Sequence, residues 1–190
     1  MMPARAHTKP PLDELTLKRA QRGDERAWRD LIERYERPIH ALVWRMLVDR
    51  RDRVEDLVQE TFMRVLRALP TFDPTGTATL LTWMLTIATR LALNELRRKQ
   101  EPAPTDEVSA SAHHDVERRQ VGDAIAAAVA KLPDDQRAVL VLREFHDLDY
   151  NEIATMLELE LGTVKSRMSR ARATLREHLL IAMPELRHGR

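Results

Sequence analysis

The stretch "YNEIATMLELELGTVKSRMSRARATL", residues 150–175, combines two short helical patterns with a strongly basic end. Its residues 162–172 carry four Lys or Arg side chains and no acidic one. At about 100° per residue, one side of a helix here is apolar and is formed by Val164, Met168, Ala171 and Leu175. The opposite half carries Lys165, Ser166, Ser169 and Arg170, with Arg167 and Arg172 at its flanks. Because a helix needs only one buried face, this polar half is free to bind something anionic.

The two helical patterns of this stretch can pack together as a helix-turn-helix. The apolar side chains available to lock the helices are Ile153, Ala154, Leu157, Leu159 and Val164, and the small Ala154 permits close approach. In that motif the second helix lies in a DNA major groove, with its N-terminal residues near base edges and its flanking cations near phosphates. A plain hairpin of two helices is the alternative from the pattern alone.

The composition favours a helical protein without membrane insertion. The chain has 190 residues, of which 43% are hydrophobic, and this suffices for one domain or two small ones. Five glycines among abundant Ala, Leu, Arg and Glu favour helices. The longest apolar runs, such as "IHALVWRMLV" at 39–48, are interrupted by charge, and no signal-peptide pattern opens the chain. We therefore expect a cytosolic protein. The absence of cysteine excludes disulfides, thiolate zinc sites, iron–sulfur clusters and cysteine nucleophiles.

The charges are unevenly distributed, although the formal net charge is only +1. From Leu161 to the C-terminus there are seven Lys or Arg residues and two Glu residues, whereas residues 134–160 are rich in Asp and Glu. This asymmetry indicates one segment that binds a polyanion and others that bind protein partners. An ordinary solvated helix face has a similar pattern, so charge alone leaves both interpretations open.

Periodicity divides the chain into two helical domains. Residues 1–11 lack periodicity and predict a loose tail. Residues 12–99 predict four helices, near 12–22, 24–48, 53–69 and 78–99, the second of which Pro38 should kink or locally break. Residues 100–116 are rich in Pro and small polar residues, which predicts a flexible linker. Residues 117–182 predict a second helical domain, followed by a tail at 183–190. The predicted fold class is all-α.

The helices of the second domain have recognisable starts. Pro133 marks a break before a helix over residues 134–146, whose acidic first turn suits the helix dipole. Asp149, with Glu152 three residues later, resembles a capping box at the start of the next helix. The final helix carries the basic face and extends to about Leu180.

Several motifs of the chain resemble one family of transcription proteins. "LPDDQRAVLVLREFHDLDYNEIATML" at 132–157 and "GTVKSRMSRARATL" at 162–175 resemble region 4 of the extracytoplasmic-function (ECF, group IV) sigma factors of bacterial RNA polymerase. "VEDLVQETFMRVLRAL" at 54–69 resembles sigma region 2.2, and "LLTWMLTIATRLALNELRRK" at 80–99 resembles regions 2.3 and 2.4. The linker is too short for the middle domain of housekeeping sigma factors, which also fits the ECF group. The resemblance covers most of the chain outside the tail and the linker.

The resemblance implies a surface for core RNA polymerase in the 54–69 helix. Leu57, Val58, Phe62 and Val65 can supply the core of the domain. The polar side chains left to dock on the coiled coil of the largest polymerase subunit are Asp56, Gln59 and Glu60. The helix at 134–145 is expected to help present the second domain to the polymerase flap. A solvated acidic face is the alternative for these residues.

The resemblance also implies recognition of the −10 promoter element by the first domain. The loop "FDPTGT" at 72–77 resembles the family's specificity loop, which captures a flipped base. Residues that can line it are Asp73, Thr75, Gly76, Thr77 and Thr79, and an ordinary interhelical turn is the alternative. Cations at the end of the following helix, Arg97, Arg98 and Lys99, should meet phosphates. The chain departs from the family pattern at Arg90 and Asn94. Trp83 is expected in the core rather than as a stacking platform.

In the second domain, the resemblance places Lys165, Ser166, Ser169 and Arg170 at positions that face the groove of the −35 element. Arg170 or Lys165 can bind guanine O6 and N7, which gives about 1–3 kcal/mol of discrimination. The residues expected at phosphates are Tyr150, Thr163, Arg167 and Arg172. Ser169 replaces what is often a bulkier side chain, so the −35 preference is expected to differ.

No residue pattern indicates an enzyme, a cofactor or a small-molecule substrate. His113 and His114 lie in the linker without a third metal ligand at suitable spacing. We therefore expect a non-enzymatic sigma factor that binds core RNA polymerase and promoter DNA and is held inactive by an anti-sigma factor. The main alternative is an autonomous helix-turn-helix regulator, which leaves the motifs of the first domain unexplained. An all-helical adaptor, which would show no salt-sensitive binding to nucleic acid, is the third interpretation.

Overall fold

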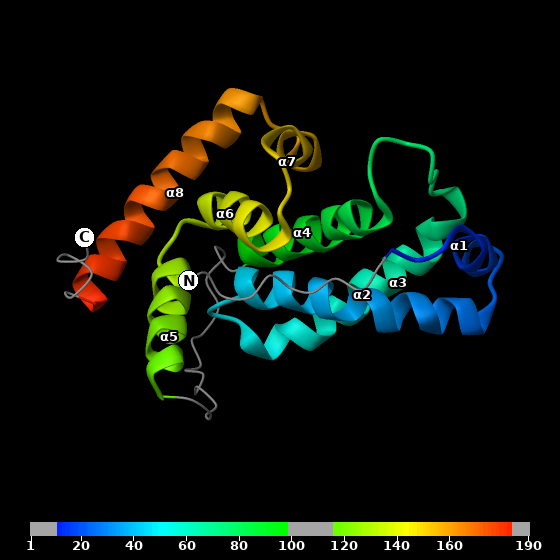
Figure 1. The fold of residues 1–190 in the computed structure, drawn as a ribbon, viewed down its shortest axis with the longest axis horizontal. Helices are drawn as coiled ribbons and strands as arrows, with labels where there is room; N and C mark the ends of the chain where they lie inside the picture. Colours follow the sequence, from blue (N-terminus) through cyan, green and yellow to red (C-terminus); the bar gives the residue numbers. More distant parts are fainter. Residues whose placement is uncertain (1–10, 99–115, 184–190) are drawn as a thin grey trace.

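The structure, a computed structural model, describes residues 11–98 and 116–183. All regular secondary structure in these two ranges is helical (Figure 1). The first domain contains α1 (Glu14–Gln21), α2 (Glu25–Met46), α3 (Val54–Ala68) and α4 (Leu80–Arg98), and short 3-10 turns, η1 (Arg51–Arg53) and η2 (Leu69–Thr71), flank α3. α2 lies against α1, α3 and α4. The four predicted helices are confirmed, with ends within two residues of those predicted.

Aspartate side chains begin the first two helices. Asp13 accepts a hydrogen bond from the backbone N–H of Thr16, and Asp24 accepts one from that of Ala27, both at 2.9 Å. These bonds, together with the Thr16 hydroxyl at Asp13, hold the pKa of each carboxyl below its usual range. Gly23 has a φ of 86°, a conformation that favours glycine and lets the chain turn tightly between α1 and α2. The turn sets α1 across the end of the bundle.

α2 continues through Pro38, so a local break in this helix is wrong, whereas the alternative, a kink at Pro38, stays a prediction. Proline removes one backbone donor from the helix. Pro38 is itself buried, however, and so are Tyr35, Ile39 and Leu42 around it. Burial of this apolar face stabilises the helix on both sides of the proline, and tertiary packing outweighs one missing hydrogen bond.

The first domain has one core built from helix faces at the expected spacing. The predicted core residues of α3, namely Leu57, Val58, Phe62 and Val65, are all buried. Trp83 is partly buried, as predicted, and its ring lies 5.0 Å from that of Phe72. The fully buried large side chains contributed by the first domain are Leu31, Ile39, Leu42, Met46, Leu47, Leu69, Met84 and Leu85.

The second domain contains α5 (Val116–Ala130), α6 (Asp134–His146), α7 (Tyr150–Leu157) and α8 (Leu161–Ala182). The capping box at the start of α7 is confirmed, because Asp149 accepts from the backbone of Glu152 at 2.9 Å and Glu152 accepts from the backbone of Asp149 at 2.7 Å. The apolar face predicted for α8 is buried at Val164, Met168 and Ala171. The helix-turn-helix is therefore assembled from α7 and α8 as predicted.

The two domains dock on each other through α6, which lies against α2 and α4 (Figure 1). Arg137 of α6 is only 3% exposed, and its guanidinium donates to the carbonyl of Met46, the last residue of α2, at 2.8 Å. Arg45 of α2 lies over the ring of Phe145 at 4.2 Å. Arg90 of α4 forms an ion pair with Glu158, which follows α7. These arginine contacts supplement an apolar interface, because the buried side chains of the two domains form one continuous cluster.

His146, at the end of α6, gives the fold a dependence on pH. Its Nε2 is buried without a hydrogen-bond partner among the described residues. Burial, reinforced by the charge of Arg45, lowers the pKa of His146 from 6.5 to about 4, although Asp147 opposes this shift. Below pH 6.5 the unfolded chain therefore binds a proton that the native chain does not, and stability falls as the pH falls from 6.5 towards 4.

We expect the free energy of unfolding to drop by about 2 kcal/mol between pH 7 and pH 5 on account of His146 alone. Urea unfolding at the two pH values would measure the drop in the wild type and in His146→Gln, whose side chain does not titrate. Between pH 7 and pH 5, the free energy of unfolding should fall by about 2 kcal/mol more in the wild type than in His146→Gln. Equal pH dependence in the two proteins would contradict the assignment.

No helix in the described ranges is long and apolar enough to cross a membrane. Three predicted segments lie wholly or largely outside those ranges, namely the tail at 1–11, the linker at 100–116 and the tail at 183–190. Lys99, His113 and His114 are also outside them.

Candidate nucleic-acid interface

The four predicted groove-facing residues lie together on the exposed side of α8. Lys165, Ser166, Ser169 and Arg170 are all exposed, opposite the buried Val164 and Met168. The Arg170 guanidinium donates to the Ser166 carbonyl at 3.3 Å and to its hydroxyl at 3.2 Å, which holds the guanidinium along the helix. Ser166 in turn donates to the carbonyl of Thr163 at 2.9 Å. Neither Lys165 nor Arg170 forms an ion pair with a described residue, so both charges are available to an anionic ligand.

The flanking cations of α8 are paired with acids of α6. Arg167 lies 3.1 Å from Asp135, and Arg172 lies 2.7 Å from Glu144. The hydrogen bond with Glu144 raises the pKa of Arg172. These pairs orient both arginines along the sides of α8, and a DNA phosphate would have to replace or share the carboxylate. Of the other residues predicted at phosphates, Thr163 is in the first turn of α8 and Tyr150 begins α7.

The predicted −10 loop is an exposed turn that is fixed at both ends. Phe72 is buried, whereas residues 73–79 are exposed. Asp73 accepts hydrogen bonds from the backbone and the hydroxyl of Thr75, at 2.8 and 2.7 Å, which hold the pKa of its carboxyl below the usual range. Thr79 accepts from the backbone of Thr82 at 3.1 Å and so caps α4. The candidates Gly76 and Thr77 lie at the exposed part of the turn.

The predicted cations of α4 differ in their environment. Arg97 and Arg98 are exposed in the last turn. The two departures from the family pattern have separate partners, because Arg90 pairs with Glu158 of the second domain, whereas Asn94 accepts a hydrogen bond from Arg97 at 3.4 Å. Arg97 also lines an open groove of about 680 Å³ between the domains. The groove is lined by side chains of both domains, including Leu93, Asp135, Leu157 and Arg167.

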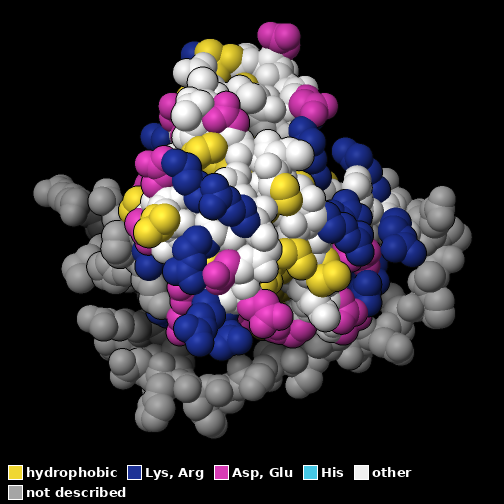
Figure 2. Space-filling view, turned by 90° about the vertical axis from the view of Figure 1, so that its right-hand side faces the viewer, with side chains coloured by type: hydrophobic (Ala, Val, Ile, Leu, Met, Phe, Trp, Pro, Cys, Tyr) yellow, Lys and Arg dark blue, Asp and Glu magenta, His cyan; other side chains and the backbone are white. Residues whose placement is uncertain are grey.

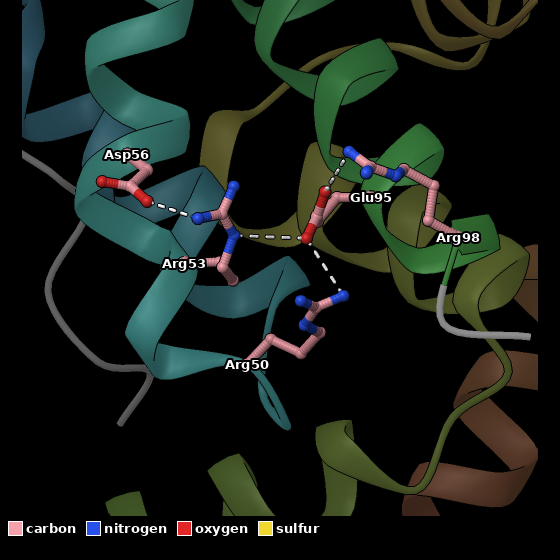
Figure 3. Close-up of polar contacts among 5 residues, drawn as sticks. All are labelled: Arg50, Arg53, Asp56, Glu95 and Arg98. Atoms are coloured by element: carbon pink, nitrogen blue, oxygen red, sulfur yellow. Dashed lines mark hydrogen bonds and ion pairs between the residues drawn. The ribbon is translucent and has the colours of Figure 1, made fainter. Parts of the chain in front are cut away.

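Glu95 organises a network that sequence reasoning missed (Figure 3). Its carboxylate is buried in α4, and it lies 3.0 Å from Arg50, 3.4 Å from Arg53 and 3.8 Å from Arg98. Arg53 also pairs with Asp56, so a chain of contacts connects the end of α4 with the start of α3 (Figure 3). In the sequence, this network is indicated by Glu95, which closely precedes Arg97 and Arg98. Its burial could not be deduced without the position of α3.

The predicted polymerase-binding residues lie on the exposed side of α3. Asp56 and Gln59 are exposed, and Glu60 is half-buried and accepts from Arg64 at 2.8 Å. Met63 and Leu66 continue the same side of the helix and are 42% and 39% exposed. Sequence reasoning missed these two, although apolar residues next to a polar docking face are a recognisable sign of a protein interface. α3 therefore presents a mixed polar and apolar stripe.

The side of the molecule where α1 lies does not form a uniform basic surface. Figure 2 shows Lys and Arg side chains interspersed with Asp and Glu, and hydrophobic groups between them. Such a mixed surface does not favour binding of a polyanion across the whole face. We therefore expect no extended DNA contact across this face, and the predicted contacts on the first domain remain the 72–79 loop and α4.

Both domains match known families. Residues 31–101 match the family described as Sigma-70 region 2, and residues 122–175 match Sigma-70, region 4. The RNA polymerase sigma-H factor of Pseudomonas aeruginosa is 35% identical over 179 residues, which cover 86% of this chain and 91% of that protein. The ECF RNA polymerase sigma-E factor of Escherichia coli (strain K12) is 30% identical over 179 residues, which cover 86% and 92% of the two chains.

Two solved structures are similar over most of the chain. CnrH in complex with the cytosolic domain of CnrY has a TM-score of 0.65 and 27% identity, and the match covers 90% of this chain and 98% of that one. The sigma factor RpoE in complex with the anti-sigma factor NepR from Bartonella quintana has a TM-score of 0.64 and 22% identity, and covers 80% and 95%. The second likeness supports the fold alone.

A region 2 bundle followed by a region 4 helix-turn-helix defines an RNA polymerase sigma factor. This chain belongs to the ECF sigma factors of the sigma-70 family. It therefore functions with core RNA polymerase in promoter-specific initiation of transcription.

Proposed function

We propose that this sigma factor reads the −35 element with α8 and the −10 element with the 72–79 loop and the end of α4. The observation that supports the proposal most directly is the exposed face of α8, where Lys165 and Arg170 lie opposite a fully buried stripe. A helix anchored on one side by its neighbours can insert its other side into a major groove. Ser166 and Ser169 are small enough to let the backbone of α8 approach the bases.

For the −10 element, we propose that the exposed part of the loop holds a flipped base. Unstacking a base costs a few kcal/mol, so a pocket that binds the extruded base both selects the sequence and traps the melted strand. Asp73 and Thr75 rigidify one side of the loop, and Gly76 and Thr77 are exposed where a base can reach them. Arg97, Arg98 and Lys99 then provide positive charge for adjacent phosphates.

For core RNA polymerase, we propose that Asp56, Gln59 and Glu60 dock on the coiled coil of the largest subunit. Asp56 and Gln59 are exposed and Glu60 is half-buried, and their position on α3 next to the apolar Met63 and Leu66 supports this role. The domain bounds that we propose are 12–99 and 117–182, with residues 100–116 as the tether. A tether raises the effective concentration of the second DNA contact once the first has formed.

We further propose a cytoplasmic, non-enzymatic subunit that an anti-sigma factor controls. The support comes from the relatives, because CnrH was solved in complex with the cytosolic domain of CnrY. The docked domains also pair one candidate DNA cation, Arg90 of the first domain, with Glu158 of the second. A partner that stabilises this docked arrangement would compete with promoter binding.

The experiment that tests these roles is transcription by core RNA polymerase, with and without this chain, from a pool of random promoter fragments. New start sites that share two spaced elements are expected only when the chain is present. If the chain ignores core but binds duplex DNA unaided, the assignment is replaced by an autonomous helix-turn-helix regulator. If the chain shows no salt-sensitive DNA binding, either with core or without it, the adaptor interpretation is favoured.

Lys165→Ala and Arg170→Ala should each reduce discrimination for the selected −35 element by about 1–3 kcal/mol, because each removes a cation that can bind a guanine edge. Competition between intact and base-substituted promoter fragments for the holoenzyme would measure this change. Arg176→Ala is the matched control, since it removes another exposed cation from α8. Loss of affinity without loss of sequence discrimination would assign the residue to a phosphate instead.

A further inference from the structure

Gln21, the last residue of α1, holds the point at which the 72–79 loop begins. Its side-chain nitrogen donates to the carbonyl of Leu69 at 3.1 Å and to the carbonyl of Phe72 at 2.7 Å. Both partners are acceptors only, so the amide must present its NH₂ group, and each of its two hydrogens has one carbonyl. One side chain of α1 thus binds backbone groups that lie 48 and 51 positions further along the chain.

The two carbonyls belong to Leu69, the first residue of the 3-10 turn η2, and to Phe72, the first residue of the loop. Leu69 also accepts from the backbone N–H of Phe72 at 3.1 Å, which closes the turn. The Phe72 ring is buried and lies 5.0 Å from the ring of Trp83 in α4. The first residue of the loop is therefore held on two sides, through its carbonyl by α1 and through its ring by α4.

Beyond Phe72 the loop depends on this anchor. Residues 73–79 are exposed, and their hydrogen bonds are short-range: Asp73 accepts from Thr75 and Gly76, and Thr79 accepts from Thr82 and Trp83. Bonds of this range fix the shape of the turn but not its place on the domain. Its place is fixed by the two ends, namely the Phe72 anchor and the Thr79 cap of α4.

We propose that Gln21 is a positioning residue for recognition of the −10 element. It lies in α1, away from the exposed tip of the loop, and acts by fixing the Phe72 carbonyl so that residues 73–79 present their pocket in the correct place. A base pocket displaced by about 1 Å loses much of its binding energy, because hydrogen bonds weaken steeply outside a narrow range of distances. This inference rests on the proposed role of the 72–79 loop.

The test compares two substitutions of Gln21 with opposite hydrogen-bonding capacity. Gln21→Glu keeps the shape of the side chain but replaces the donor with a carboxylate that repels both carbonyls. Gln21→Lys changes the shape but restores donors to the same acceptors. Arg22→Gln is the matched control, because it changes the net charge by the same single unit as Gln21→Glu at an exposed neighbouring position.

Holoenzyme formed with each variant would be assayed on promoters selected from the random pool, and on the same promoters with the −10 element substituted. We expect Gln21→Glu to lower the preference for the intact −10 element roughly tenfold, whereas binding to core and preference for the −35 element stay as in the wild type. Gln21→Lys should retain most of the −10 preference. Wild-type −10 preference in Gln21→Glu, or equal losses in both Gln21 variants, would overturn the inference.

Direct substitutions in the loop separate this inference from the function on which it rests. If Asp73→Ala and Thr75→Ala leave the −10 preference unchanged, the loop is not the reader and the proposed function fails. If they reduce the preference and Gln21→Glu does not, the loop reads the element but Gln21 does not position it. A variant that no longer joins core would point to a general folding defect and would count against a specific positioning role.

Discussion

Replacing Arg137 with alanine is expected to lower the free energy of unfolding by about 4 kcal/mol, the largest effect of a single substitution that we predict. The guanidinium donates four hydrogen bonds to backbone carbonyls, and its Nη1 forms an ion pair with Asp134 at 3.2 Å. The carbonyls belong to Met46 at 2.8 Å, Ala130 and Leu132 at 2.9 Å, and Val129 at 3.3 Å. Removal of the side chain leaves buried acceptors unsatisfied and a cavity in their midst.

The position of these carbonyls explains why one arginine matters to both domains. The last carbonyls of a helix lack partners within the helix. Arg137 provides hydrogen-bond donors for such carbonyls at the end of α5, in its own domain, and for that of Met46, the last residue of α2 in the other domain. Loss of the side chain therefore weakens the second domain and its attachment to the first. Burial lowers the pKa of Arg137, and Asp134 opposes that shift, so the guanidinium remains charged.

Urea unfolding followed by the helical signal would measure the effect of Arg137→Ala. Arg143→Ala is the control, because Arg143 is in the same helix and donates to one carbonyl, that of Leu148, at 2.9 Å. The control should lose about 1 kcal/mol. Arg137→Lys should fall between the two, since an ammonium has three donors and lacks the planar fork. If Arg137→Ala is no less stable than the control, the guanidinium does not hold the domains as described.

Replacing Glu95 with glutamine is expected to destabilise the protein by about 2 kcal/mol. The substitution keeps the size of the side chain but removes the negative charge that Arg50, Arg53 and Arg98 share. The three guanidiniums would then repel one another around a neutral group. The expected loss is smaller than for Arg137 because these arginines are partly or largely exposed and can turn towards water.

The dependence on salt identifies the cause of the Glu95→Gln effect. Added chloride screens repulsion between arginines, so the stability difference from the wild type should shrink between low and high ionic strength. Glu14→Gln is the matched control, because its partner Lys18 is exposed and such pairs contribute about 0–1 kcal/mol. A difference that is independent of salt would indicate a packing defect rather than loss of a shared counterion.

Local signals allowed the helices and the helix-turn-helix to be predicted from the sequence. Asp149 and Glu152 predicted the start of α7, and the spacing of Val164, Met168 and Ala171 predicted which side of α8 is buried. Both predictions depend on residues three or four apart in one helix, so the pattern can be recognised without knowledge of the tertiary structure. Pro38 shows the limit of such reasoning, because burial of the surrounding face decided the outcome.

The candidate site was predictable in part for the same reason. The exposed positions Lys165, Ser166 and Arg170 followed from the period of α8, but the pairing of Arg167 with Asp135 and of Arg172 with Glu144 did not. An ion pair between helices depends on their crossing and on the rotamers of long side chains, and neither is encoded in local spacing. The same limit applied to Glu95, whose partners Arg50 and Arg53 precede α3.

The sequence by itself determined an all-helical chain with two domains, a basic helix and the motifs of sigma regions 2 and 4. Only the tertiary structure decided how the domains meet, through Arg137 at the Met46 carbonyl, and how the 72–79 loop is anchored, through Gln21. Both contacts join a side chain to a backbone carbonyl far away in sequence. Every residue except proline offers the same carbonyl and N–H, and proline still offers the carbonyl, so the sequence contains no signal for which one will be used. Only the folded arrangement of helices selects it.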